Sequence, residues 1–273
     1  MAGGVAISPD GLRVYVANLR GLLVVDAASN RPVQQLDIQG GAQAAAVSAD
    51  GSTVFVSGND GFAAYDSTSL QLINGVPTTR TINIALSPDG ARAFVADPDL
   101  ALFDINLNTW APGNQWSWQE CLHPVDAAVS PNASSLRIVC LGVGVPSTLV
   151  TVNIATLEIT ATLPLQNDPS ALAMSSDGNR AYIATPAANA VVVVDTSGAP
   201  MVLDTISVGA GPSSLALTKA GDQLYVTNAV GNSVSVIDTA TRSVIDTIAV
   251  GPAPRTNGDF IGPNEFLLLT GFE

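Results

Sequence analysis

The residues best able to do chemistry are concentrated in one segment, 108–124, which reads NTWAPGNQWSWQECLHP. It holds all three tryptophans, one of the two cysteines and the only histidine, His123. Indole rings offer flat apolar faces with a polar N–H, and an imidazole beside them can donate or accept a proton. We therefore expect a stacking or carbohydrate-binding surface, with burial of the rings between sheets as the alternative. The tryptophans concerned are Trp110, Trp116 and Trp118.

The composition argues against several other kinds of chemistry. Lys219 and His123 are the only residues of their types, which removes most routes to Schiff-base catalysis, histidine base catalysis and multi-histidine metal sites. With 23 acidic and 10 basic residues, the net charge of −13 repels nucleic acid and anionic membranes. No apolar run approaches the roughly 20 residues that a membrane-spanning helix needs. We predict no nucleic-acid partner, no transmembrane segment and no catalytic residues.

A tight turn of the form Ser-Pro-Asp-Gly recurs along the chain at intervals of 39 to 45 residues. Proline presets φ, aspartate supplies an acceptor and glycine tolerates positive φ, so each turn is expected to close a β-hairpin. A period near 40 residues made of short apolar runs is typical of β-propeller blades. We predict an all-β fold, one propeller domain over residues 1–273. Its copies lie near 3–40, 41–79, 80–119, 120–166, 167–209 and 210–251, followed by a partial closing element at 252–273.

Each copy predicts four strands, A to D. The small apolar run before the turn suits an innermost strand, where several sheets converge and space is least. Strand B carries an aromatic residue in five copies, and Arg137 takes that place in the fourth. Strand D alternates apolar and polar residues, as an outer strand with one wet face should. Strand C is expected to end at an acid or amide that accepts hydrogen bonds from the next turn: Asp26, Asp66, Asp104, Asn153, Asp195 and Asp238.

The two cysteines fall at the same end of one predicted hairpin. Cys121 precedes strand A of the fourth copy, and Cys140 ends its strand B. Hairpin geometry brings these positions together, so a disulfide is a reasonable expectation. A metal site built from Cys121, His123 and Cys140 is the alternative, and it would need a fourth ligand.

The loops from strand D to the next strand A, and from B to C, share one face of a propeller. Ligands generally bind in the funnel that such loops form. Charged residues on these loops are candidates for a polar pocket, and solvated loop charges are the alternative. No cofactor is expected, although a Ca²⁺ or Mg²⁺ ion on the axis would leave little local signature. The residues of this face are Arg20, Asp60, Arg80, Asp97, Asp99, Glu120, His123, Asp168 and Arg255.

The sixth copy carries Tyr225-Val226-Thr227-Asn228, followed by VSVIDTATRSVIDTIAVG, and the first copy carries Tyr15-Val16-Ala17-Asn18. Over residues 3–251 the repeat resembles the YVTN family of β-propellers. The resemblance implies an extracellular, periplasmic or cell-surface protein, as in surface-layer and secreted relatives. The N-terminal MAGGVAISPDG has no charged region before an apolar one, so we expect any export signal to have been removed or never present.

Two questions remain open at this point. Residues 252–273 either form a reduced seventh blade or add a strand to six blades that close directly. The function expected is a non-catalytic scaffold whose loop face binds a protein or carbohydrate partner, with Trp116, Trp118, Glu120, His123, Arg20, Arg80, Asp97 and Asp168 as candidate contacts. The alternative is a divalent-metal-dependent lactonase or lyase with its site in the axial funnel, since similar propellers include such enzymes.

Overall fold

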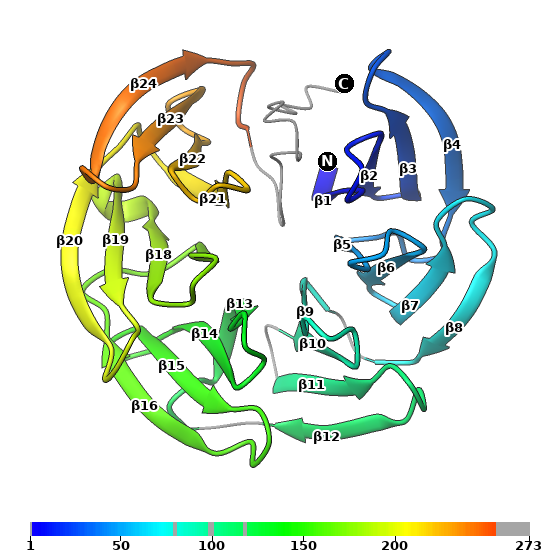
Figure 1. The fold of residues 1–273 in the computed structure, drawn as a ribbon, viewed down its shortest axis with the longest axis horizontal. Coiled ribbons are helices and arrows are strands. Elements are labelled where there is room, and N and C mark those ends of the chain that lie inside the picture. Colours follow the sequence, from blue (N-terminus) through cyan, green and yellow to red (C-terminus); the bar gives the residue numbers. More distant parts are fainter. Residues whose placement is uncertain (1, 79–80, 98–100, 117–118, 255–273) are drawn as a thin grey trace. The chain divides into compact units, whose positions relative to one another are not determined.

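The computed structural model describes residues 2–78, 81–97, 101–116 and 119–254, and these form six four-stranded antiparallel sheets (Figure 1). Each sheet is built from four strands that are consecutive in the chain, and each corresponds to one predicted copy. The prediction of an all-β fold with six four-stranded blades is therefore confirmed. We call the sheets blades 1 to 6 in chain order. The closing element expected after blade 6 lies almost wholly outside the described residues, which end at 254.

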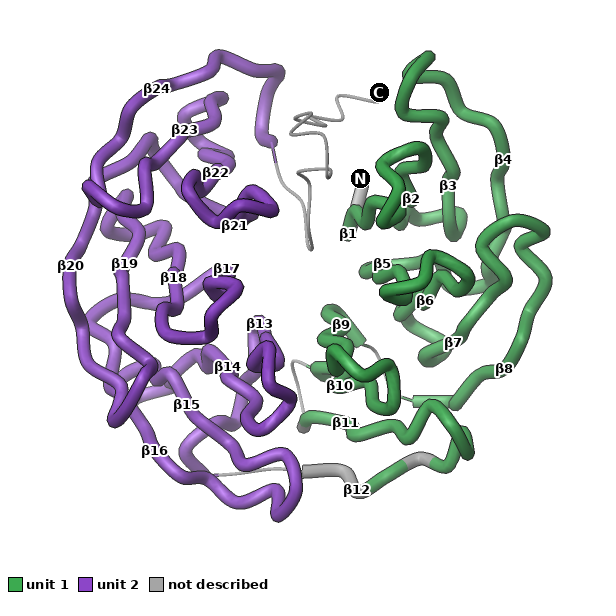
Figure 2. Tube along the Cα trace, in the orientation of Figure 1, with its two compact units in different colours: residues 1–117, 256–268 green, residues 118–255, 269–273 purple. Residues whose placement is uncertain are grey.

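The chain divides into two compact units (Figure 2), and blades 1 to 3 make up the described part of the first. Blade 1 contains β1 (Ala2–Ile7), β2 (Arg13–Asn18), β3 (Gly21–Asp26) and β4 (Arg31–Asp37). Blade 2 contains β5 (Ala44–Val47), β6 (Thr53–Gly58), β7 (Gly61–Asp66) and β8 (Leu72–Val76). Blade 3 contains β9 (Asn83–Leu86), β10 (Arg92–Asp97), β11 (Ala101–Asn106) and β12 (Pro112–Trp116).

Blades 4 to 6 make up the described part of the second unit. Blade 4 contains β13 (His123–Val129), β14 (Ser135–Leu141), β15 (Thr148–Asn153) and β16 (Ile159–Pro164). Blade 5 contains β17 (Ala171–Met174), β18 (Arg180–Thr185), β19 (Ala190–Asp195) and β20 (Met201–Ser207), with a short 3-10 helix at Pro186–Ala188. Blade 6 contains β21 (Pro212–Leu217), β22 (Gln223–Asn228), β23 (Ser233–Asp238) and β24 (Ser243–Ala249).

The Ser-Pro-Asp-Gly turns close the hairpins between the first two strands of a blade. In blade 1, Ser8 Oγ donates to Asp10 Oδ1 at 2.5 Å, and the backbone N–H of Arg13 donates back to Ser8 Oγ at 2.9 Å. Gly11 has φ of 73°, in the left-handed region that glycine adopts without a steric cost. The turn is thus locally determined, which is why it could be recognised in the sequence.

Apolar clusters fill the space between neighbouring blades within each unit. In the first unit, Tyr15 packs with Val54 and Val56 between blades 1 and 2. In the second unit, Tyr182 packs with Val226 between blades 5 and 6. Side chains on strands alternate between two faces, so blade 2 contributes Val54 and Val56 to one cluster and Phe55 to another.

Polar groups from strand B also connect neighbouring blades. Arg13 donates to the carbonyl oxygen of Ser67 at 2.8 Å, and the Tyr15 hydroxyl reaches the same oxygen at 3.2 Å. Arg137, which interrupts the aromatic pattern, donates to the carbonyl oxygen of Thr196 at 2.8 Å. Arg137 therefore donates to the next blade as Tyr15 does in blade 1. One hydrogen-bond donor replaces another at this position.

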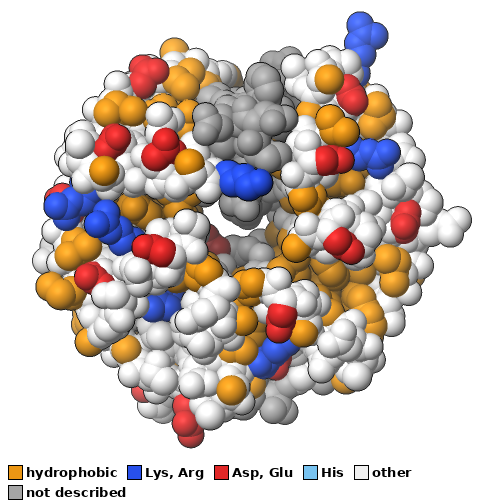
Figure 3. All heavy atoms as spheres, viewed as in Figure 1, with side chains coloured by type: hydrophobic (Ala, Val, Ile, Leu, Met, Phe, Trp, Pro, Cys, Tyr) orange, Lys and Arg blue, Asp and Glu red, His pale blue; other side chains and the backbone are white. Residues whose placement is uncertain are grey.

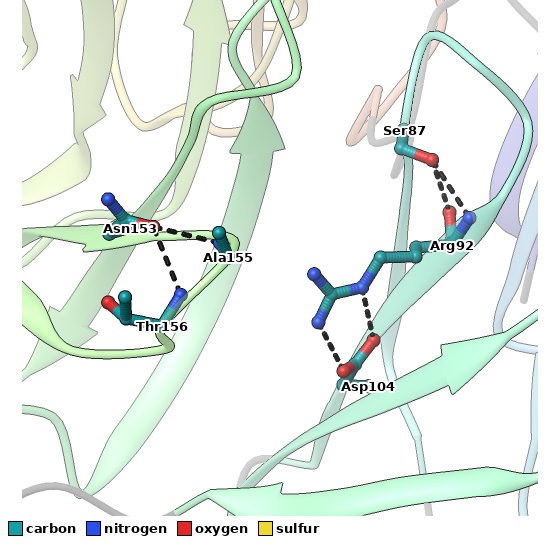
Figure 4. Close-up of polar contacts among 6 residues, drawn as sticks. All are labelled: Ser87, Arg92, Asp104, Asn153, Ala155 and Thr156. Carbon is teal, nitrogen blue, oxygen red and sulfur yellow. Dashed lines mark hydrogen bonds and ion pairs between the residues drawn. The ribbon is translucent and has the colours of Figure 1, made fainter.

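The predicted end of strand C is wrong in blade 3. Strand β11 ends at Asn106, whose Oδ1 accepts hydrogen bonds from the backbone N–H groups of Asn108 at 2.9 Å and Thr109 at 3.0 Å. Asn153 closes the equivalent turn of blade 4 in the same way (Figure 4). Asp104 instead forms an ion pair with Arg92 of the adjacent strand (Figure 4).

Candidate functional site at the loop end of blade 4

A disulfide joins Cys121 and Cys140, whose Cα atoms are 5.2 Å apart. Cys121 precedes β13, and Cys140 pairs with Pro124 near the end of β14. The bond therefore ties the segment entering blade 4 to the end of its second strand. Because both sulfur atoms are used, no thiolate remains here for the alternative metal site with His123.

The loop that follows this disulfide is long and apolar. It spans residues 142–147 between β14 and β15, whereas two residues connect the equivalent strands in blades 1 and 2. Val143 is 72% exposed and Val145 is 64% exposed. Leu122 and Leu141 are also exposed, and the pairing of His123 with Leu141 places them at the same end of the hairpin. We call Leu122, Leu141, Val143 and Val145 the blade 4 apolar surface.

Hydrogen bonds around Ser147 hold this loop in place. The buried Ser147 hydroxyl donates to Asp168 Oδ1 at 2.6 Å and accepts from the backbone N–H of Gly142 at 3.1 Å. Thr148 Oγ1 donates to the carbonyl oxygen of Glu120 at 2.9 Å. The loop is thus fixed at both of its ends, by Ser147 on one side and by the disulfide on the other.

The structure brings three of the predicted contact residues to this end of blade 4. Glu120 lies beside Cys121 and is exposed, and Asp168 is exposed while it accepts the Ser147 hydrogen bond. His123 begins β13 and is half-buried. Glu120 and His123 are close to Leu122 in the chain, and Asp168 is bonded to the end of the loop that carries Val143 and Val145.

Of the predicted tryptophan surface, only Trp110 has a side chain that the structure describes. Trp110 is half-buried and packs against Phe62, with ring centroids 6.2 Å apart, at the edge of an apolar cluster of the first unit. For this ring the structure favours the alternative of packing between blades. Trp116 ends β12, where its backbone pairs with Leu102. Trp118 lies outside the described residues.

The other predicted contacts belong to the first unit or fall outside the described residues. Arg20 and Asp37 form an exposed ion pair at 3.2 Å, a kind of contact that contributes little to stability. Asp97 is 1% exposed, so its carboxylate is buried at the end of β10 instead of lining the loop face. Asp60 is exposed on the loop between β6 and β7. Arg80, Asp99 and Arg255 lie outside the described residues.

Acidic side chains do not gather into a patch on the face of either unit that Figure 3 shows. In the part of the chain that the structure describes, no three His, Cys, Asp or Glu residues are grouped so that they could hold a metal ion. Hydrogen bonds from neighbouring hydroxyl and backbone N–H groups lower the pKa of the turn aspartates, to about 2 for Asp50. The others lowered in this way include Asp10, Asp26, Asp66, Asp89, Asp177, Asp195 and Asp238.

Sequence reasoning missed the four aliphatic residues of the blade 4 apolar surface. A signal for them was present, because Gly142 to Pro146 reads GVGVP between two strands. Glycine and proline mark a loop there, and valines placed on a loop are exposed unless a neighbour covers them. The longest interval between successive turns, from Ser130 to Ser175, also contains this insertion.

Comparison with known proteins gives the fold but no family. No protein-family model and no curated protein matches the chain. A solved structure of hydrazine synthase from Kuenenia stuttgartiensis is similar, with a TM-score of 0.80 and 18% sequence identity, over 88% of this chain and 84% of that chain. The fold is a β-propeller. At this identity the similarity concerns the fold alone, and propellers carry many unrelated functions. Among the described residues, no helix is long and apolar enough to cross a membrane.

Proposed function

We propose that this chain is a non-catalytic, YVTN-type β-propeller that binds a protein partner through the blade 4 apolar surface. The observation that carries the proposal is the exposure of four aliphatic side chains on a loop end fixed by a disulfide. Apolar surface gains about 25 cal/mol for each Å² removed from water. Burial of this surface by a partner would therefore stabilise the complex.

The surroundings of the surface match the anatomy of a protein interface. Such interfaces have an apolar centre and a polar rim, and Glu120, His123 and Asp168 supply polar groups around the aliphatic residues. The Ser147 hydrogen bonds and the disulfide hold the loop before a partner arrives. Ordering the loop in advance lowers the entropy lost on binding. Aliphatic side chains favour a protein partner over a sugar, which stacks on aromatic rings.

The disulfide also supports an exported or cell-surface location. Disulfides persist in oxidising compartments and are rare in the cytosol, where thiols are kept reduced. The resemblance of Tyr225-Val226-Thr227-Asn228 and its flanking strand to the YVTN repeat points the same way, since relatives of that type are secreted or belong to surface layers.

The proposal is tested by replacing the two loop valines. The variant Val143→Ser/Val145→Ser keeps the loop and the disulfide but removes most of its exposed apolar area. We expect cross-linking on intact cells to capture a partner with the unmodified protein. Binding of that purified partner should weaken by about tenfold or more in the variant, since each buried valine contributes on the order of 1.5 kcal/mol.

Val230→Ser is the matched control, because Val230 is also 72% exposed and lies on the equivalent loop of blade 6. The control variant should bind the partner as the unmodified protein does. Equal binding by all three proteins, or equal loss in both variants, would contradict a site on blade 4.

A further inference from the structure

A groove of about 230 Å³ opens on blade 2, wholly within the first unit. One wall is the connection from β4 to β5, which contributes Ile38. The remaining lining comes from β6, β7 and β8 and the segments that follow them. The lining residues used below are Ala63, Tyr65, Gly75 and Asp60.

The groove exists because two paired residues of blade 2 are unusually small. Ala63 of β7 pairs with Gly75 of β8. The same register positions hold Leu23 and Gln35 in blade 1, and Phe103 and Gln115 in blade 3. A Cβ built on Gly75 would lie 3.4 Å from the Phe62 carbonyl oxygen and 3.5 Å from Ala63 Cβ, which is ordinary contact. A side chain would therefore fit at Gly75, so backbone geometry does not require glycine there.

A carboxylate stands at the rim of this apolar groove in a fixed place. Asn59 Nδ2 donates to the carbonyl oxygen of Gly40 at 2.8 Å, and Gln43 Nε2 donates to Asn59 Oδ1 at 2.8 Å. These bonds tie the loop carrying Asp60 to the β4–β5 connection. A Cβ built on Gly40 would lie only 2.6 Å from Asp60 Oδ2, so the carboxylate rests against that backbone. Among the described residues, no hydrogen bond or ion pair engages the Asp60 carboxylate.

We propose that the groove binds a small organic cation, a primary amine on a short aromatic or aliphatic body. The apolar body would cover Ala63, Tyr65 and Gly75, while the ammonium group donates charge-assisted hydrogen bonds to Asp60. The net charge of −13 favours the approach of cations and disfavours anions. The groove is smaller than the roughly 300–1,000 Å³ of drug-sized pockets, which limits the ligand to a fragment or to one side chain of a larger molecule.

The test is a titration followed by two-dimensional NMR of the backbone amides, with 2-phenylethylammonium as the probe. We expect saturable shifts at Ala63 and Gly75, with a Kd on the order of 1 mM for so few ligand atoms. The neutral isostere 2-phenylethanol should bind about fivefold or more weakly, and phenylacetate should not bind detectably. This ranking separates a charged, shaped site from an apolar groove that accepts any phenyl group.

Two variants distinguish the parts of the site. Gly75→Gln introduces the residue found at the equivalent position of blade 1 and should abolish binding of the amine and of the alcohol, while the thermal unfolding midpoint stays within a few degrees. Asp60→Asn should keep the shape of the groove and remove the preference for the amine over the alcohol. Asp246→Asn changes the net charge equally on β24 and should leave binding intact.

Three outcomes would overturn the proposal. The first is amide shifts spread over many acidic residues, which would indicate non-specific association with the charged surface. The second is unchanged binding in Gly75→Gln, and the third is equal loss of amine preference in Asp60→Asn and Asp246→Asn.

Discussion

Asp50 illustrates how single side chains couple the turns of this protein to pH. Its Oδ1 accepts hydrogen bonds from Ser48 Oγ at 2.6 Å and from the backbone N–H of Ser52 at 3.0 Å. These bonds, with the Ser48 hydroxyl as the largest cause, lower the pKa of Asp50 from 3.8 to about 2. A group whose pKa is lower in the folded state stabilises it above the unfolded pKa, near 3.9, and loses this effect as pH falls toward 2.

Replacing Asp50 by asparagine should remove this pH dependence while keeping the turn. Asn132 already fills the position in blade 4, where its Oδ1 accepts from Ser130 Oγ at 2.8 Å and Ser134 N–H at 3.1 Å. We expect Asp50→Asn to unfold at a lower urea concentration than the unmodified protein at pH 6, and the difference to shrink markedly at pH 2. A difference of equal size at both pH values would show that the Asp50 pKa is not the cause.

Whether the role of a single residue could be predicted depended on how far along the chain its contact partners lie. The turn aspartates could be predicted because their partners lie within four residues, as Ser8 and Asp10 do. The contact of Trp110 with Phe62 could not, because the two rings come from different blades. Asp104 was predicted to end its strand because acids end the equivalent strands of other copies. The residue that accepts the hydrogen bonds of the turn is Asn106, two positions later.

At the scale of strands, Arg137 of β14 raises the question of whether stability requires a hydrogen bond between blades or the arginine itself. Arg137 is 6% exposed, and this burial lowers the pKa of its guanidinium group. Two of its nitrogens donate to Ser135 Oγ and the Thr196 carbonyl oxygen, both at 2.8 Å, while its Nε has no partner among the described residues.

We expect Arg137→Ala to lower the free energy of unfolding by about 2–4 kcal/mol, because it leaves a cavity and an unpaired carbonyl. Arg137→Tyr restores the residue type of Tyr15 and Tyr182, and it should stay within about 1 kcal/mol of the unmodified protein. Urea unfolding measures both variants. Equal destabilisation by alanine and tyrosine would show that the guanidinium itself is needed.

Strand patterns were easier to predict than the surfaces built on them. Four strands per copy followed from local turns and alternating apolar residues, which act over a few positions. The groove in blade 2 depends on the pairing of Ala63 with Gly75, and that register follows from how β7 and β8 align. The blade 4 apolar surface likewise depends on bringing the segment before His123 to the same end of the hairpin as Leu141, which only the register shows.

At the scale of the whole molecule, the Cys121–Cys140 disulfide gives the two units different resistance to opening. The bond lies wholly within the second unit and links residues 19 apart in the sequence. A cross-link over a loop of this size stabilises by about 3 kcal/mol in the chain-entropy account, chiefly by restricting the opened chain. Its effect should therefore be confined to the blades whose opening frees that loop.

The variant Cys121→Ser/Cys140→Ser should raise amide exchange in β13 to β15 by up to roughly 100-fold, and leave exchange in β6 and β7 unchanged. Hydrogen exchange followed by mass spectrometry on peptides from these strands measures both regions at once. The unmodified protein should show no free thiol before reduction. Equal acceleration in both regions would mean that the units open together. In the expected case, the loop carrying Val143 and Val145 also loses its fixed conformation, so the partner should bind this variant more weakly even though both valines are present.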